Sequence, residues 1–223
     1  MGAKWRTAKK YGDPQHETVI EPFAGSAAYS VYHEARNVLL YDTNFVICGI
    51  WHYLIHVAES EILSLPVDFD SVEDLQIPEE AKWLIGFWIT KGNVHPNKTR
   101  SAWARQYRHS GDCKVWSEAV RVRIASQVSK IRDWRIFCQD YRECPDIEAT
   151  WFIDPPYQIS GRHYPKSEVN YEDLAQFCLN RKGQTIVCEM EGANWLPFQP
   201  FATARAMIGK GRAGFSKELV YTA

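Results

Sequence analysis

The segment Trp151–Gln158, WFIDPPYQ, places an acid, two prolines and a tyrosine directly after three bulky apolar residues. Each proline fixes φ at about −65° and lacks an N–H, and a residue before a proline is held in extended geometry. Asp154 and Pro155 can therefore present a carboxylate oxygen and a peptide carbonyl together. Two such acceptors match the two hydrogens of an exocyclic amino group. The ring of Tyr157 offers a flat face for the base that carries this group.

Acids also close the other apolar runs of the chain. Because the carboxyl ends of parallel strands meet at one edge of an open sheet, acids at these ends line a common pocket. Carboxylates suit hydroxyls and amines better than phosphates. The acids that end or nearly end these runs are Glu21, Asp42, Asp140, Asp154 and Glu189.

Alternating apolar runs and helical patterns predict a parallel sheet with crossover helices, an α/β fold. The turn 21–27, EPFAGSA, joins the first run to a helical pattern, and Gly25 in it permits close backbone approach of a ligand. A buried helix is predicted at 45–57 and a closing hairpin at 203–222. The predicted strands lie within 18–23, 37–42, 134–141, 149–154 and 184–191.

The middle of the chain has a different character. Pro78 followed by two acids predicts a helix start, and apolar residues at Val120, Ile124, Val128 and Ile131 have a helical period. We therefore expect a small, mainly helical insert at 78–133 in a sheet domain formed by 1–77 and 134–223.

Positive charge is concentrated in this insert. Residues 82–135 contain twelve lysines and arginines against three acids, a net charge of +9, although the whole chain carries −1. Such a block indicates a region that meets a polyanion, while a solvated helical face is the alternative.

Composition indicates a packed globular protein, with 223 residues, 45% hydrophobic content and nine tryptophans. The apolar runs are too short to span a membrane, and the N-terminus has no signal-peptide core and has Arg6 where myristoylation needs Ser or Thr. We expect a cytoplasmic protein, a monomer without a metal. The six scattered cysteines are expected to be reduced and mostly buried; the alternative is a zinc site from His95, His109, Cys113 and Cys138.

The ordered motifs resemble those of DNA adenine N6-methyltransferases of the DNA adenine methylase group. They are GAK (2–4), EPFAGS (21–26), LLYDTN (39–44), CQDY (138–141) and DPPY (154–157), and the resemblance covers nearly the whole chain. It implies a Rossmann-like S-adenosylmethionine-dependent methyltransferase sheet with helices on both faces. The basic insert stands where that group keeps its target-recognition domain.

The resemblance also implies roles for single residues. Lys4 would lie near the cofactor's carboxylate, and Asp42 would accept hydrogen bonds from its ribose. The methionine portion would be bordered by Glu21, Phe23, Ala24 and Gly25, and the adenine by Asp140 and Tyr141. The target adenine, flipped out of double-stranded DNA, would be held by Asp154, Pro155, Pro156 and Tyr157.

In the insert, positive and aromatic side chains are candidates for phosphate contacts, base contacts and stacking. They are Lys98, Arg100, Trp103, Arg105, Tyr107 and Arg108. Three alternatives stay open. Cytosine-N4 methyltransferases usually have Ser before PPY, methyltransferases of RNA or protein amides often have Asn there, and a catalytically silent DNA-binding protein would keep the fold.

Overall fold

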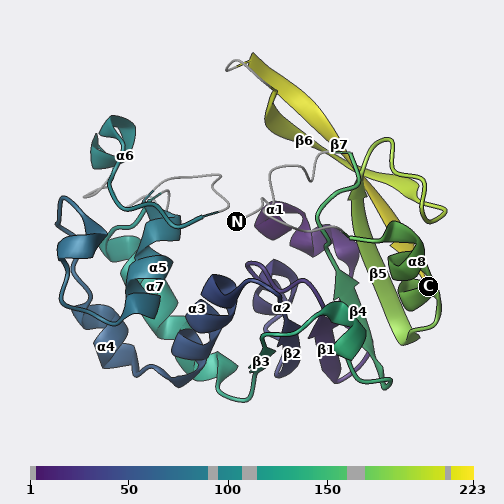
Figure 1. Cartoon of the computed structure of the whole chain (residues 1–223), viewed down its shortest axis with the longest axis horizontal. Helices are drawn as coiled ribbons and strands as arrows, with labels where there is room; N and C mark the ends of the chain where they lie inside the picture. The colour runs from purple at the N-terminus through teal and green to yellow at the C-terminus, as the bar shows by residue number, and fades with distance from the viewer. Residues whose placement is uncertain (1–3, 90–94, 107–114, 160–168, 209–211) are drawn as a thin grey trace. The chain divides into compact units, whose positions relative to one another are not determined.

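The structure is a computed structural model that describes residues 4–89, 95–106, 115–159, 169–208 and 212–223 (Figure 1). For Arg6, Trp103 and residues 204–208 and 212–216 it describes the backbone alone. The chain forms two compact units. One comprises the described residues of 3–41 and 139–223, the other those of 42–138.

The strands form one mixed sheet with the order β3-β2-β1-β4-β5-β7-β6. Neighbours among β1, β2, β4 and β5 pair in parallel, and β7 is antiparallel to both β5 and β6. All the predicted strands and the closing hairpin are present. Their bounds are Thr18–Glu21 (β1), Asn37–Tyr41 (β2), Arg135–Phe137 (β3), Glu148–Ile153 (β4), Lys182–Met190 (β5), Gln199–Ile208 (β6) and Arg212–Thr222 (β7).

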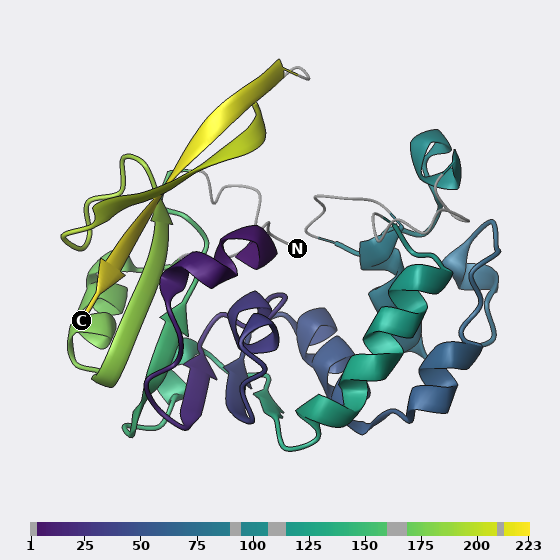
Figure 2. The ribbon, with the colours of Figure 1, turned by 180° about the vertical axis from the view of Figure 1, so that it is seen from behind.

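Helices cover both faces of this sheet, as Figures 1 and 2 show for the unit that contains β4 and β5. Successive side chains of a strand point to opposite faces. The buried Trp151 and Phe152 of β4 therefore contact the helices on the two faces of the sheet. Phe152 meets Tyr29 in a stacked arrangement at 4.4 Å, whereas Trp151 meets Phe177 edge-on at 5.8 Å. Tyr29 lies on α2 (Ala28–Tyr32) and Phe177 on α8 (Tyr171–Leu179). The short α1 (Lys4–Thr7) and the 3-10 helix η1 (Ala8–Tyr11) lie on the Phe152 side, where the ring of Tyr11 contacts Phe152.

The second unit is mainly helical. Its core includes the buried rings of Trp51 and Trp134, 5.6 Å apart, which join α3 to the segment after η3. At the surface, the exposed Phe45 of α3 contacts the Trp83 ring of α5 edge-on at 5.6 Å. The predicted helices at 45–57 and after Pro78 are present. The helices are α3 (Phe45–His56), α4 (Glu59–Ser64), η2 (Val72–Asp74), α5 (Glu79–Trp88), α6 (Ala102–Gln106), α7 (Glu118–Val128) and η3 (Ser129–Ile131).

These contacts place the boundary of the compact unit at 42, upstream of the predicted insert boundary at 78. The reason is that α3 buries its apolar side against α5 and the 131–134 turn, so it belongs with them. The fold class is α/β, with a seven-stranded mixed sheet and helices on both sides.

Several arginines of the basic block bind backbone carbonyls within their own unit. Arg100 is 4% exposed and donates to the carbonyls of Trp116 (3.0 Å) and Val67 (2.8 Å). Arg121 donates to the Leu65 carbonyl at 2.8 Å, and Arg132 donates to the carbonyls at the end of α3. Part of the positive charge therefore stabilises the chain turns after α3 and α4.

Among the described residues, no helix is long and apolar enough to cross a membrane, and no cluster of His, Cys, Asp or Glu is arranged to hold a metal. His109 and Cys113 of the zinc alternative lie outside these residues. Free thiols are found at five described cysteines; Cys138 is exposed and the others are buried, namely Cys48, Cys144, Cys178 and Cys188.

Replacing Arg100 by methionine should lower the free energy of unfolding by about 3 kcal/mol, because the buried carbonyl of Trp116 and the partly buried carbonyl of Val67 would lose their donor. Urea denaturation followed by circular dichroism measures this change. The matched control is Arg105→Met, since Arg105 is exposed on α6. Equal stability of the two variants would show that the Arg100 guanidinium is not needed to satisfy these carbonyls.

Candidate functional site

The apolar strand β4 delivers Asp154 to the carboxyl edge of the sheet. Ile153 and Pro155 on either side of Asp154 are buried. The hydroxyl of Tyr171, at the start of α8, donates to the carbonyl of Pro156 at 2.7 Å. No hydrogen bond reaches the carbonyl of Pro155 from the described residues. The turn thus has one carbonyl already occupied and one open.

The carboxylate of Asp154 is also open at one oxygen. Oδ1 is buried and has no hydrogen-bond partner among the described residues, although the side chain as a whole is 26% exposed. Burial raises the pKa of Asp154, and the nearby ammonium of Lys4 opposes this rise. A buried acceptor without a donor is costly, so Oδ1 can accept a hydrogen bond from a group outside the described residues.

Lys4, the first residue of the N-terminal helix α1, lies beside Asp154. Its Nζ lies 3.6 Å from Asp154 Oδ1 and 3.6 Å from Oε2 of Glu218 on β7, and donates to the Tyr11 hydroxyl at 3.0 Å. It also lies over the Tyr157 ring, 5.3 Å from the centroid. Burial lowers the pKa of Lys4, but Asp154 and the other neighbours outweigh this effect and the pKa is raised. The structure therefore brings Lys4 to the DPPY turn, a contact that the resemblance did not imply.

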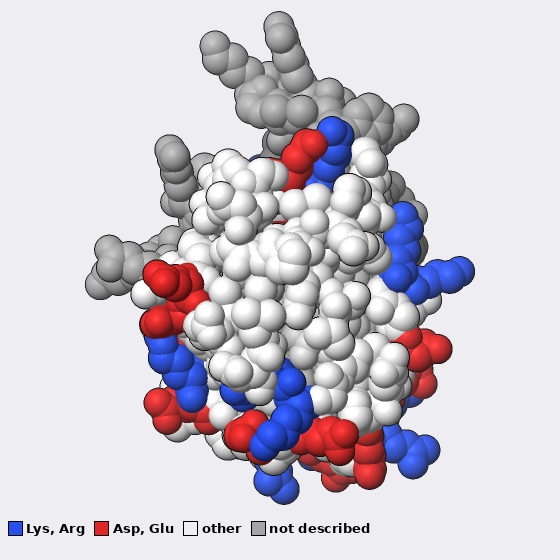
Figure 3. Space-filling model, turned by 90° about the vertical axis from the view of Figure 1, so that its right-hand side faces the viewer, with Lys and Arg blue, Asp and Glu red and all other residues white. Residues whose placement is uncertain are grey.

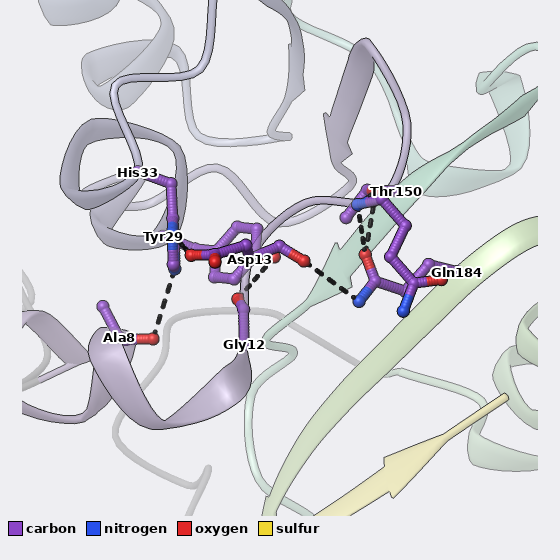
Figure 4. A network of polar contacts seen from close by, with 8 residues as sticks. Ala8, Gly12, Asp13, Tyr29, His33, Thr150 and Gln184 are labelled. Atoms are coloured by element: carbon purple, nitrogen blue, oxygen red, sulfur yellow. Dashed lines mark hydrogen bonds and ion pairs between the residues drawn. The ribbon is translucent and has the colours of Figure 1, made fainter.

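The segment that carries Lys4 is attached to the sheet by a polar network (Figure 4). From α2, Tyr29 donates to the Gly12 carbonyl at 3.1 Å, and His33 lies between the Ala8 carbonyl and the Asp13 carboxylate. At the sheet end of the network, Gln184 donates to the Asp13 carbonyl at 3.3 Å. These bonds fix where Lys4 and Tyr11 stand relative to β4 and β5.

Glu21 ends β1, the strand next to β4, and is 2% exposed. Its Oε1 accepts from the backbone N–H (2.9 Å) and the hydroxyl (2.6 Å) of Ser30. Burial raises the pKa of Glu21 to about 8, while the bonds from Ser30 lower it and the charge of Asp154 raises it further. The Glu21 carboxyl thus stabilises α2 through two hydrogen bonds from Ser30.

The turn after Glu21 is shaped by left-handed backbone at Gly25 (φ 43°) and Ala27 (φ 42°). A Cβ at Gly25 would meet no atom closer than the Phe23 carbonyl at 4.0 Å, so the space over this residue is open. The Phe23 ring lies 5.5 Å from that of Tyr141, and the buried Tyr141 hydroxyl has no partner among the described residues. The rings of Phe23 and Tyr141 thus lie together in the unit that also contains Gly25.

Asp140 and Asp42 both make hydrogen bonds with residues close to them in sequence. Asp140 caps η4 (Tyr141–Glu143), accepting from Arg142 N–H at 3.0 Å, and its carboxylate pairs with the Arg142 guanidinium at 3.0 Å. Asp42 belongs to the other compact unit, where it accepts from Asn44 N–H at 2.9 Å. It directly follows Tyr41, whose carbonyl accepts from Ala24 N–H at 2.8 Å.

Glu189 is a site residue to which the sequence assigned no role. It is fully buried and accepts from the N–H groups of Gln158 (2.8 Å) and Met190 (2.7 Å) and from the Trp195 indole (3.0 Å). The carboxylate therefore anchors the residue that follows Tyr157. A lone acid within the apolar run TIVCEM was the available signal, because a buried carboxylate needs several donors.

The candidates for nucleic-acid contact differ in their placement. Lys98 is 72% exposed and pairs with Glu73 at 3.1 Å, and Arg105 is exposed. Arg100, expected at the surface, is instead buried against backbone carbonyls and the Phe69 ring, so its guanidinium has a packing role. The Trp103 side chain, Tyr107 and Arg108 lie outside the described part of the chain, so their roles in nucleic-acid contact stay predictions.

The face seen in Figure 3 has an uncharged centre, and Lys, Arg, Asp and Glu are mixed around its margin. Two exposed ion pairs of the unit that contains β5 and β7 join Lys182 to Asp146 (2.8 Å) and Lys217 to Glu191 (2.7 Å). This face therefore has no continuous basic surface among its described residues.

No protein-family profile and no curated protein matches the chain. Among solved structures, a conserved hypothetical protein from Streptococcus pyogenes is similar over 91% of this chain and 84% of that chain. The two are 10% identical with a TM-score of 0.34, a likeness too low to carry an argument.

The environment of Glu21 predicts a pH dependence of stability. A carboxyl whose pKa rises on folding binds its proton more tightly in the folded state. Its stabilising contribution is full below the unfolded value of 4.5 and is lost as the pH rises through about 8. The free energy of unfolding should therefore fall across this window. Glu21→Gln, which keeps an oxygen for Ser30, should flatten the profile measured by urea denaturation at a series of pH values.

The control for this experiment is Glu191→Gln, which changes an exposed carboxylate on the same unit. Its profile should follow that of the wild-type protein. A Glu21→Gln profile as steep as the wild-type one would assign the pH dependence to another group.

Proposed function

We propose that the protein transfers a methyl group from S-adenosylmethionine to N6 of adenine in double-stranded DNA. The observation that carries this proposal is the pair of open acceptors in consecutive residues, Asp154 Oδ1 and the Pro155 carbonyl. An exocyclic amine has two hydrogens, and each acceptor takes one of them. The neighbouring Pro156 carbonyl is already occupied by Tyr171, so the donors of a substrate are directed to the first two acceptors.

The strand order supports a nucleotide-type ligand at this edge. From β3 to β5 the order is 3-2-1-4-5, which is found in doubly wound dinucleotide-binding sheets. In such sheets the ligand binds where the order reverses, beyond the carboxyl ends of the strands. Here the reversal lies between β1 and β4, whose ends carry Glu21 and Asp154. A Rossmann-like methyltransferase sheet is the finer interpretation of this arrangement.

The chain fits S-adenosylmethionine in the chemistry of its groups. A nucleoside could approach the backbone at Gly25, where the space is open. The rings of Phe23 and Tyr141 suit an aromatic base, and the Tyr141 hydroxyl has no partner among the described residues. The residues of this unit that would hold the cofactor are Glu21, Phe23, Ala24, Gly25, Asp140 and Tyr141. The resemblance also assigns Lys4 and Asp42 to the cofactor; Lys4 lies beside Asp154, and Asp42 belongs to the other compact unit. When bound, the cofactor supplies an electrophilic methyl group on a sulfonium, so the protein needs to position the amine rather than activate the donor.

Residues of the DPPY turn would activate the amine by accepting its hydrogens. The lone pair of an adenine amine is delocalised into the ring, which makes it a poor nucleophile. Hydrogen bonds from both N–H groups to Asp154 and Pro155 favour a pyramidal nitrogen with a localised lone pair. The half-buried ring of Tyr157 offers a stacking face for the base, which must leave the duplex to reach it.

The positively charged segment near α6 would supply sequence-independent affinity for DNA. Lys98 and Arg105 are exposed cations of the other unit and are the described candidates for phosphate contacts. Trp103, Tyr107 and Arg108 remain candidates for stacking and base contacts. Arg100 is left out because its guanidinium is used inside the unit.

Asp154→Asn should lower methylation of DNA on the order of 100- to 1000-fold, because a neutral amide oxygen accepts a hydrogen bond more weakly than a carboxylate does and carries no charge to stabilise the developing positive charge on the amine. Transfer of a tritiated methyl group to unmethylated DNA measures the rate, and mass spectrometry of the digested DNA identifies N6-methyladenine. Binding of S-adenosylmethionine, measured by calorimetry, should stay close to that of the wild-type protein.

The matched control is Asp146→Asn, an exposed carboxylate on the same unit, which should keep wild-type activity. Methylated cytosine or methylated RNA in place of N6-methyladenine would contradict the proposed substrate. Absence of any transfer by the wild-type protein, with DNA binding intact, would assign it to the silent DNA-binding class.

Binding to DNA should weaken steeply as salt rises, because phosphate contacts release counterions. Replacing Lys98 and Arg105 together by glutamine should reduce the slope of log K against log salt by about 2. Fluorescence anisotropy with a labelled duplex at several salt concentrations measures the slope. Lys182→Gln, at an exposed lysine of the other unit, is the control and should leave it unchanged. An unchanged slope in the double variant would show that Lys98 and Arg105 do not contact DNA phosphates.

A further inference from the structure

One ammonium is shared by two carboxylates next to the DPPY turn. Lys4 Nζ stands 3.6 Å from Asp154 Oδ1 and 3.6 Å from Glu218 Oε2. Both distances exceed the 2.7–3.2 Å range, roughly, of an N–H to oxygen hydrogen bond. Lys4 therefore acts on both groups through its charge, without donating a close hydrogen bond to either.

The hydroxyl of Tyr11 holds the ammonium in this intermediate position. It accepts from Lys4 Nζ at 3.0 Å and donates to Glu218 Oε2 at 3.2 Å. The Tyr11 ring is in turn fixed between Phe152, edge-on at 5.1 Å, and Phe201, stacked at 4.3 Å. A rigid ring thus sets the distance between Lys4 and Glu218.

The consequence is that Asp154 Oδ1 stays open. Lys4 Nζ would need to move by less than about 1 Å to donate directly to this oxygen. The pull of Glu218 on the opposite side opposes this movement, since a buried ammonium between two carboxylates is attracted to both. Loss of the Glu218 charge would leave Asp154 as the remaining carboxylate within 4.0 Å of Lys4 among the described residues.

We propose that Glu218 is a positioning residue for methyl transfer, which through Tyr11 and Lys4 keeps Oδ1 of Asp154 open for the hydrogen of the substrate amine. This inference rests on the proposed function, because it assigns Asp154 to the amine. Glu218 itself does not touch the reacting atoms. It acts by holding a competing donor away from the acceptor that the reaction needs.

Glu218→Gln tests the proposal, because glutamine keeps the shape and an oxygen for Tyr11 but has no charge. Lys4 should then close on Asp154, and kcat for DNA methylation should fall on the order of 100-fold with an unchanged KM for S-adenosylmethionine. Glu191→Gln, the same change at an exposed carboxylate of this unit, should keep the wild-type kcat. A wild-type kcat in Glu218→Gln would overturn the proposal.

A second substitution separates positioning from a merely structural role. In the Glu218→Gln background, Lys4→Met removes the donor that captures Asp154, so the double variant should be more active than Glu218→Gln alone. Losses that multiply would show that Glu218 does not act through Lys4. A strong loss of S-adenosylmethionine affinity on replacing Lys4 alone, measured by calorimetry, would assign Lys4 to the cofactor and also overturn the proposal.

Tyr11→Phe provides an independent route if Glu218→Gln does not fold. It keeps the stacked ring but removes the bridging hydroxyl, so it should lower kcat in the same way. A Tyr11→Phe protein with wild-type kcat would count against the network.

A readout without methylation distinguishes failure of this inference from failure of the proposed function. Carbon-13 NMR titration of Asp154 in the wild-type protein and in Glu218→Gln follows its carboxyl group directly. Glu218 raises the pKa of Asp154 and Lys4 lowers it, so the pKa should drop in the variant. If the pKa drops in Glu218→Gln while the wild-type protein methylates no nucleic acid, the network is supported and the proposed function is rejected. An unchanged pKa in an active protein would reject the network alone.

Discussion

The arrangement of the site depends on one buried cation. Lys4 is 5% exposed, and an ammonium removed from water needs opposite charge close by. Asp154 and Glu218 supply this charge from β4's end and from β7, and Tyr11 supplies the acceptor. The ion therefore joins the N-terminal helix, the DPPY turn and the antiparallel part of the sheet. The network around Asp13 and Gln184 serves the same end, because it fixes the segment that carries Lys4.

Sequence patterns predicted the elements of the sheet unit well. Apolar runs that end in acids located β1, β2, β4 and β5, and the proline pair located the turn, because these signals are local. The bond between Tyr11 and Glu218 joins residues 207 positions apart and left no local signal. The role of Glu189 was hidden for the same reason, since its donors Gln158 and Trp195 come from different segments. Local sequence patterns do not identify hydrogen-bond partners that meet only after folding.

Charge counting was less reliable, because formal charge does not separate surface cations from buried ones. The +9 of residues 82–135 includes guanidinium groups that bind backbone carbonyls, such as those of Arg100, Arg121 and Arg132. Arginine suits this purpose, since its planar fork carries several donors and stays charged. Guanidinium donors of the kind that bind phosphates are used here to satisfy backbone carbonyls of the helical unit. Its boundary at 42 also follows from packing by α3 that no composition shift marks.

The central position of β1 has a consequence for the order of folding. Its partners are β2, close in sequence, and β4, which follows the whole of 42–138. Closing a loop of that length costs only a few kcal/mol, on the order of (3/2)RT ln n, but it makes the contacts between Glu21 and Asp154 strongly non-local. We expect the centre of the sheet to assemble late, after local helices have formed. The edge that holds the candidate site is then a late product of folding, and its rate of appearance depends on how quickly the intervening helical unit brings its ends together.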